Sequence, residues 1–263
     1  MPSAKVNGLN LNYEIRGTGP CVLFIHGIGA DLKHPLGIFN TAVPQHFTVL
    51  AYDPRGIGKS DSPAGPYTIA DLADDAAELA AVVGWDRYHV LGTSFGGMVA
   101  QELALRHPAA VDKLVLGVTN AGGANAGPRV DNLHELSTIE KLRLSDIRQD
   151  AAWAAANPEK VAAFEAQSRA MTDAMRADPK LAAGFAAQAQ AVIIHDTFDR
   201  LPQITAPTLV FAGRYDGSNP PERTKAMADR ISGARYELLE SGHGNWYSDP
   251  AAWEMIIDFL RGN

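Results

Sequence analysis

Five short apolar runs, each bounded by glycine, proline or aspartate, recur along the chain and constrain its fold more than any other feature. They cover residues 21–26, 47–52, 87–92, 111–118 and 207–212. The runs are apolar almost without alternation, as expected for strands that helices cover on both faces of a parallel sheet. Helix-like segments lie at 68–84, 96–107, 220–231 and 249–260. This alternation predicts an open, twisted and mostly parallel α/β sheet flanked by helices.

Two segments depart from the alternation. Residues 4–16 carry an Asn-Gly turn between alternating segments, which predicts a hairpin. Residues 121–203 are rich in alanine and contain no strand-like run. We interpret 121–203 as a helical lid over a core formed by residues 1–120 and 204–263. The alternative is a bundle of surface helices with no role in access to a site.

The segment Gly92 to Gly97 (GTSFGG) places a serine between the predicted strand 87–92 and the helix 96–107. A tight turn from strand to helix holds a serine hydroxyl at the carboxyl edge of the sheet, and glycines are needed where side chains would collide. The helix N-terminus also favours negative charge developing near Ser94. A glycine-rich turn without any chemistry could look the same, but the strand–turn–helix context favours a nucleophile.

An acid and a histidine follow Ser94 along the chain. The predicted strand 207–212 leads into Asp216, at the sheet edge where ligands bind in open α/β sheets. Of eight histidines, His243 alone lies in a glycine loop between a C-terminal strand and a final helix. An isolated loop aspartate is usually a turn former. Taken together, the residues predict a triad with Ser94 as nucleophile, His243 as general base and Asp216 as the acid that orients it.

Five motifs occur in register along nearly the whole chain: His26-Gly27-Ile28-Gly29, Asp53 to Ser60, Gly92 to Gly97, Gly213 to Asp216, and Ser241-Gly242-His243. Together they resemble the α/β-hydrolase fold. The segment Pro66 to Leu72, the chain length and the single compact lid are most similar to the β-ketoadipate enol-lactone hydrolases and small carboxylesterases. The resemblance implies that the backbone N–H groups of Ile28 and Phe95 form an oxyanion hole. We interpret three further residues of these motifs as structural: His26, Asp53 and Arg55.

The predicted reaction is hydrolysis of a small ester or lactone through an acyl-enzyme on Ser94, with no cofactor or metal. A serine at this position disfavours the branches of the fold that form an ester on an aspartate. Two other enzymatic readings stay open: a hydrolase of carbon–carbon bonds in ring-cleavage products, and a cofactor-free perhydrolase. A reading of another class is a small-molecule receptor that keeps the triad but turns over slowly.

Charge and hydropathy exclude some partners. The net charge is −7 and no cluster of lysine and arginine occurs, which argues against nucleic acid as a partner. No stretch approaches about 18 uncharged apolar residues, and the first residues do not read as a signal peptide. We therefore expect a cytoplasmic protein with no membrane partner. The single cysteine, Cys21, is expected to be a small buried hydrophobe.

The sequence does not specify the substrate-binding residues or the oligomeric state. The apolar candidates for pocket walls in the predicted lid, which could equally pack the lid against the body, are Trp153, Phe164, Met171, Met175 and Phe185. An anionic lactone would need a cation near the pocket, for which the candidates are Arg129, Arg143 and Arg169.

Overall fold

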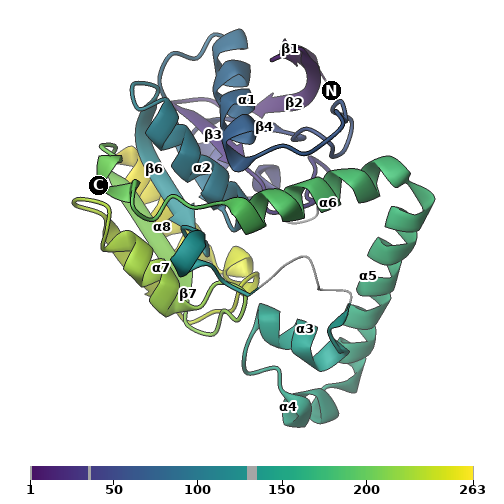
Figure 1. Ribbon diagram of the computed structural model, residues 1–263. Helices are drawn as coiled ribbons and strands as arrows, with labels where there is room; N and C mark the ends of the chain where they lie inside the picture. Colours follow the sequence, from purple (N-terminus) through teal and green to yellow (C-terminus); the bar gives the residue numbers. More distant parts are fainter. Residues whose placement is uncertain (1, 35–36, 129–134, 263) are drawn as a thin grey trace.

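A single eight-stranded sheet forms the centre of the computed structural model, which describes residues 2–34, 37–128 and 135–262 (Figure 1). The strand order is β1-β2-β4-β3-β5-β6-β7-β8. The first two strands pair antiparallel with their neighbours, and all remaining pairs are parallel, as predicted. The strands are β1 (Ser3–Val6), β2 (Leu9–Arg16), β3 (Cys21–Ile25), β4 (Thr48–Tyr52), β5 (Tyr88–Thr93), β6 (Val111–Gly117), β7 (Thr208–Gly213) and β8 (Arg235–Leu239).

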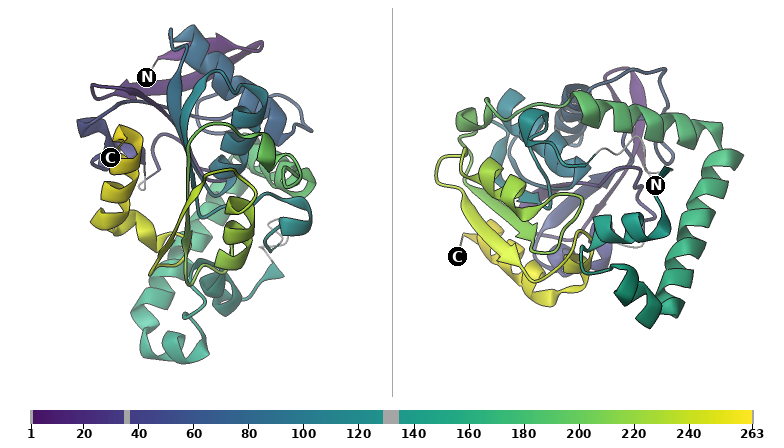
Figure 2. Two further views of the ribbon diagram at one scale, coloured as in Figure 1. Left: turned by 90° about the vertical axis from the view of Figure 1, so that its left-hand side faces the viewer. Right: turned by 60° about the horizontal axis from the view of Figure 1, so that its bottom comes forward.

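Helices cover both faces of the sheet, which explains why the strands are apolar without alternation (Figure 2). Along β3, Val22 and Phe24 pack into the cluster that contains α8 (Pro250–Arg261). Leu23 and Ile25 enter the opposite cluster. That second cluster contains residues of α1 (Ile69–Val82), α2 (Phe95–Arg106) and α7 (Pro221–Ala228).

Predicted and observed element boundaries agree closely in the sheet and its covering helices. Each of the five predicted strands begins and ends within one residue of an observed strand. Helix α1 begins after a capping box, in which the Thr68 hydroxyl accepts from the Asp71 N–H and the Asp71 carboxylate accepts from the Thr68 N–H. Helix α7 ends at Ala228, three residues earlier than predicted, because residues 229–231 form turns.

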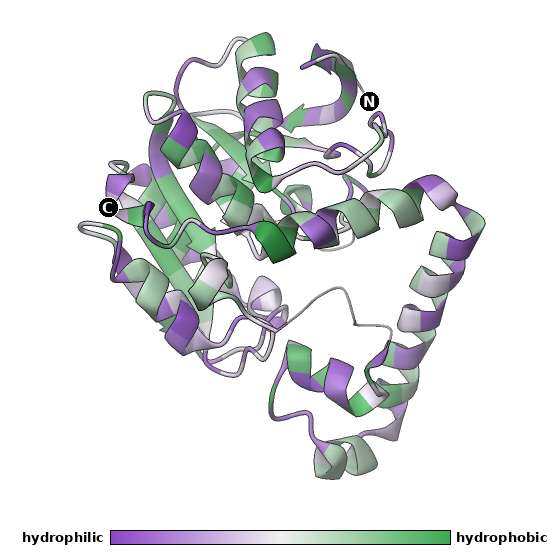
Figure 3. Ribbon diagram, viewed as in Figure 1, coloured by the Kyte–Doolittle hydropathy of each residue, from purple (hydrophilic) through white to green (hydrophobic). Residues whose placement is uncertain are grey.

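The segment between β6 and β7 contains four α-helices among its described residues: α3 (Thr138–Ser145), α4 (Ala151–Ala156), α5 (Pro158–Ala177) and α6 (Pro179–Ile194). Helix α6 crosses beside the body, whereas α5 descends from its end at the periphery (Figures 1 and 2). No residue of α5 is buried, and its surface is mixed in hydropathy (Figure 3). Helix α6 buries Gly184, Gln188, Ala189 and Ala191 and so helps to anchor this segment to the sheet and its covering helices. Among the described residues, no helix is long and apolar enough to cross a membrane.

Candidate active site

Ser94 lies in a strained turn between β5 and α2. Its backbone has φ 55° and ψ −122°, a conformation that costs about 1–3 kcal/mol and persists only where the surroundings enforce it. A Cβ on Gly92 would lie 2.2 Å from the carbonyl oxygen of Gly96, and a Cβ on Gly96 would lie 2.1 Å from that of Ile25. Glycine is therefore required on both sides of the serine, because a side chain at either position would collide with the backbone of a neighbouring segment.

His243 and Asp216 form hydrogen bonds in series with Ser94. The distance from Ser94 Oγ to His243 Nε2 is 3.1 Å, and that from His243 Nδ1 to Asp216 Oδ2 is 2.8 Å. Because the Asp216 carboxylate can only accept, His243 Nδ1 carries the proton and leaves Nε2 free to accept from the serine hydroxyl. The other carboxylate oxygen accepts from the N–H groups of Ser218 and Asn219, at 2.8 and 2.7 Å. The three side chains predicted to cooperate thus lie in contact, although 149 residues separate Ser94 from His243.

The two predicted oxyanion donors belong to the two chain segments that border this serine. Phe95 is the first residue of α2, and the N–H of a first helical residue has no carbonyl partner within its helix. A Cβ on Gly27 would lie 4.0 Å from Ser94 Cβ, so the loop that contains Ile28 passes beside the serine. None of the described residues accepts from the Ile28 N–H, whereas the next N–H, that of Gly29, donates to Gln188 Oε1 at 2.8 Å.

The last turn of α3 holds the loops that carry the acid and the base. Its Ser145 carbonyl accepts from the His243 backbone N–H at 2.6 Å, and its Leu144 carbonyl accepts from the Ser218 hydroxyl at 3.0 Å. Carbonyls in the last turn of a helix have no partner within the helix, which leaves them free to accept from these loops. Just beyond the helix, the Ile147 N–H donates to the Tyr215 carbonyl at 2.8 Å.

Asp146, the residue after α3, also links the inserted segment to the loops that carry Asp216 and His243. Its carboxylate accepts from Arg148 Nε at 2.9 Å and from Asn245 Nδ2 at 3.4 Å, two residues beyond His243. Burial opposes ionisation, but the hydrogen bonds from Arg148 prevail and hold the pKa of Asp146 below its usual value. The Arg148 guanidinium in turn lies 3.7 Å from the centre of the Tyr215 ring, beside the acid. An ionised carboxylate of the inserted segment therefore connects both loops.

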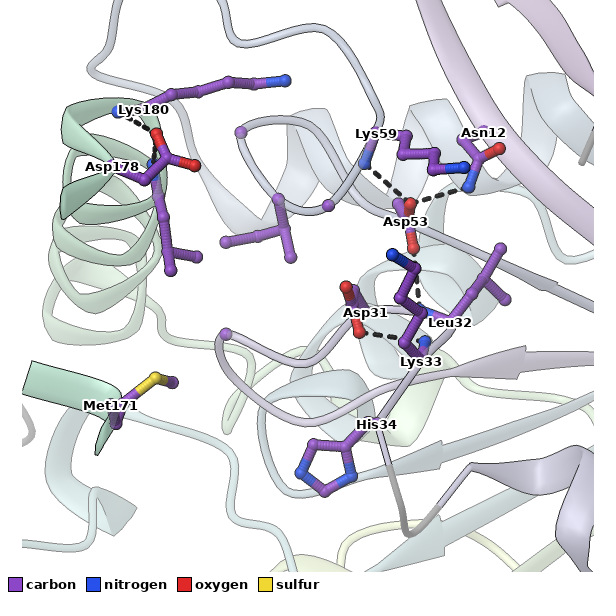
Figure 4. A pocket seen from close by; sticks show the side chains of 15 residues that line it. Asn12, Asp31, Leu32, Lys33, His34, Asp53, Lys59, Met171, Asp178 and Lys180 are labelled. Atoms are coloured by element: carbon purple, nitrogen blue, oxygen red, sulfur yellow. Dashed lines mark hydrogen bonds between the residues drawn. The ribbon is translucent and has the colours of Figure 1, made fainter. Parts of the chain in front are cut away.

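Asp53 and Arg55, which the sequence analysis interprets as structural, hold neighbouring loops in place. The buried Asp53 carboxylate accepts from the N–H groups of Leu32 and Lys59 and from the Asn12 amide (Figure 4). Arg55 forms an ion pair with the buried Asp75 at 2.6 Å. These contacts fix the chain after β3 and β4.

Two buried histidines are uncharged near neutral pH. Burial lowers the pKa of His26 to about 3, with a smaller contribution from His34. Burial also lowers the pKa of His195 to about 4. The described residues contain no group of three or more His, Cys, Asp or Glu side chains that could hold a metal ion. Cys21 is half-buried, less than expected, and burial raises its pKa.

A cavity of about 420 Å³ lies beside the loop after β3, with Gly29 on its wall (Figure 4). Its ionisable lining includes Lys33, Lys59 and Lys180, and an equal number of aspartates. Neither Ser94 nor His243 lines it. The formal charges of these lysines and aspartates balance.

The predicted substrate-binding candidates separate into distinct groups. Met171 and Phe185 lie against Gly29, at 3.9 and 2.8 Å from the position of a Cβ on that glycine. Arg143 lines a second cavity, of about 460 Å³, together with Gly217 next to the acid. Arg169 is exposed and lies 3.7 Å from Glu165. Trp153, Phe164 and Met175 are half-buried in the inserted helices, and Arg129 lies outside the described residues.

Comparisons with known proteins agree with this architecture. A family model described as alpha/beta hydrolase fold matches residues 20–250. The enol-lactonase from Burkholderia xenovorans LB400 has 29% identity and a TM-score of 0.78, covering 99% of this chain and 100% of the other. A hydrolase from Pseudomonas aeruginosa PA01 has 31% identity and a TM-score of 0.77, covering 100% and 98%. A Caulobacter vibrioides protein provisionally named carbamate hydrolase RutD is 30% identical, covering 100% and 98%.

Proposed function

Because the chain belongs to the α/β-hydrolase family, we propose that it is a serine hydrolase that cleaves small carboxylic esters or lactones through an acyl-enzyme on Ser94. The observation that carries the proposal is the unbroken series of hydrogen bonds from Ser94 Oγ through His243 to the buried Asp216. A serine in a strained turn, with an imidazole at its hydroxyl, is the arrangement that nucleophilic acyl transfer requires.

In the proposed reaction, His243 Nε2 removes the proton of Ser94 as its Oγ attacks the substrate carbonyl carbon. The N–H groups of Ile28 and Phe95 bind the oxyanion of the tetrahedral intermediate. His243 then donates the proton to the leaving alcohol, which departs and leaves the acyl group on Ser94. Water, deprotonated by His243, attacks the acyl-enzyme and releases the acid, while Asp216 keeps the imidazole in the required tautomer.

The same proposal assigns roles to the two parts of the chain. Residues 1–120 and 204–263 form the core that carries the three catalytic side chains, and residues 121–203 form a lid over them. The attachment of the lid to the core at Gln188 and at Ser145 supports this division, because both contacts meet loops of the catalytic site.

Among the possible reactions, hydrolysis of an ester or lactone is favoured because an enol-lactonase matches this chain over nearly its full length. Cleavage of a carbamate is chemically related, since it also begins with attack on an acyl carbon, and the name of one relative points to it. Carbon–carbon bond hydrolysis and perhydrolysis would use the same three side chains, so product analysis has to separate them.

The test is turnover of p-nitrophenyl acetate and of a simple lactone by the purified protein and by Ser94→Ala. We expect repeated turnover by the parent chain and a loss of up to about 10⁶-fold in kcat for the variant. Turnover that survives in Ser94→Ala would refute the proposal. Stoichiometric acylation without turnover would instead support the receptor reading, and activity only on ring-cleavage dienoates would support the carbon–carbon hydrolase.

A further inference from the structure

Gln188 is a fully buried amide on α6 that faces the loop after β3. Its Oε1 accepts from the Gly29 N–H at 2.8 Å, and its exposed fraction is 0%. Because an N–H must meet an acceptor, this bond fixes the orientation of the amide, with the oxygen toward Gly29 and the NH₂ group turned away from it.

The Nε2 atom of Gln188 has no hydrogen-bond partner among the described residues. Buried amide groups in folded proteins are almost always paired, so an unpaired donor requires an explanation. Gln101 on α2 provides the contrast within this chain, because it is equally buried and uses both ends of its amide. Its Nε2 donates to the Asn120 carbonyl at 3.0 Å, and its Oε1 accepts from the Thr197 hydroxyl at 2.6 Å.

The unpaired donor lies next to the proposed oxyanion hole. Nε2 and Oε1 are bonded to the same carbon, so Nε2 is one amide group away from the contact with Gly29, the neighbour of Ile28. Phe185, one turn earlier on α6, and Met171 on α5 also lie against Gly29. Nε2 is therefore an unpaired donor on a side chain that contacts this loop, and Met171 and Phe185 are apolar side chains that lie against the same glycine.

In the proposed reaction, the two halves of an ester lie on different sides of the site. His243 must protonate the leaving alcohol, and its loop contacts α3 through Ser145. Gln188 belongs to α6, a different helix of the inserted segment. The acyl half lies on the side away from His243, and Gln188 contacts the loop after β3 through Gly29.

We propose that Gln188 is a specificity-determining residue whose Nε2 donates to an oxo or carboxyl oxygen on the acyl chain of the substrate. This inference rests on the proposed function. It narrows the substrate to esters or lactones of short acids that carry an acceptor oxygen a few bonds from the scissile carbonyl. Apolar acyl chains leave the donor unpaired, whereas an oxo-acyl chain pairs it once Met171 and Phe185 make room.

The test compares p-nitrophenyl esters that differ only in the acyl chain: 4-oxopentanoate against pentanoate, and 5-oxohexanoate against hexanoate. Each kcat/KM is divided by the rate constant of hydroxide hydrolysis, which removes intrinsic reactivity. We expect the parent chain to prefer at least one oxo ester by about tenfold, the effect of about 1.4 kcal/mol that one net hydrogen bond supplies.

Two substitutions at position 188 test whether the preference comes from Nε2. Gln188→Met keeps the length but loses both polar atoms. Gln188→Glu keeps the acceptor for Gly29 and loses the donor while its carboxyl is ionised, so the rates are compared over a pH series. Both should abolish the preference, and the second variant answers the question if the first does not fold. A preference of equal size in the parent and the variants, or no preference in the parent, would overturn the inference while leaving the hydrolase assignment intact. Failure to hydrolyse any of the four esters would instead count against the proposed function.

Discussion

Replacing Asp216 with asparagine isolates the role of the acid, because the structure shows which of its hydrogen bonds survive. Asparagine keeps a carbonyl oxygen that can accept from Ser218 and Asn219, as Asp216 Oδ1 does at 2.8 and 2.7 Å. Its NH₂ group then occupies the place of Oδ2, 2.8 Å from His243 Nδ1. Two donors cannot face each other, so the imidazole moves its proton to Nε2 and can no longer accept from Ser94.

The expected loss follows from this change of tautomer. Losing one ordinary hydrogen bond would cost about 1 kcal/mol, or about fivefold in rate. Losing the base that deprotonates the nucleophile costs far more, up to about 10⁴-fold, which corresponds to about 5.4 kcal/mol in activation free energy. The fold should be retained, because the hydrogen bonds from Ser218 and Asn219 remain and the asparagine NH₂ group can donate to the unprotonated Nδ1 of His243.

The assay is kcat/KM for p-nitrophenyl acetate, with the urea midpoint measured on the same samples. Asp258→Asn on the exposed side of α8 is the matched control, and both its activity and its midpoint should equal those of the parent. A folded Asp216→Asn variant with activity within a few fold of the parent would refute the assigned role of the acid.

Three further predictions concern packing, positioning and pH. Gly96→Ala should lower the unfolding free energy by about 1–3 kcal/mol or more, because its Cβ would lie 2.1 Å from the Ile25 carbonyl oxygen. Gly244→Ala, where no atom lies within 4 Å of the added Cβ, should lower it far less. Equal urea midpoints for the two variants would contradict this prediction. Asp146→Asn removes the charge that joins the two catalytic loops, and should lower kcat by up to about 10²-fold with little change in KM; a loss confined to KM would refute a positioning role. Burial lowers the pKa of His195 from 6.5 to about 4, so the unfolded chain binds a proton that the folded chain excludes. The stability that this histidine contributes is therefore complete above about pH 6.5 and is lost as pH falls toward 4; His195→Gln should show a shallower loss in urea unfolding over that range, and parallel slopes would contradict it.

The positions of strands and tight turns could be predicted from the sequence, because each depends on the residue types within a few positions. The apolar runs predict the strands within a residue because burial on both faces demands apolar residues at every position. The turn around Ser94 and the loop before His243 could be located because backbone crowding leaves no alternative to glycine at Gly92, Gly96 and Gly242. Parallel strands then bring the ends of β5 and β7 to one edge of the sheet, which is why residues far apart in sequence could be assigned to one triad.

The contacts of the inserted segment could not be predicted in this way. The sequence does not separate α3 and α4 from the rest of the segment, because α3 is only eight residues long and α4 is almost entirely alanine. The bond from Gly29 to Gln188 joins residues 159 apart, and nothing local to either residue indicates it. The contact of Ser145 with His243 uses a backbone carbonyl, which any residue could supply. Such contacts depend on how the helices pack and carry little sequence signal.

The central claim is that the hydroxyl of Ser94 is the nucleophile, and covalent labelling tests it most directly. The protein is treated with a fluorophosphonate, and the modified residue is located by peptide mass spectrometry while residual esterase activity is followed. We expect one label per chain, on Ser94, with activity lost in proportion to labelling and no label on Ser94→Ala. A label on any other residue, or full activity in a chain that is completely labelled on Ser94, would contradict it.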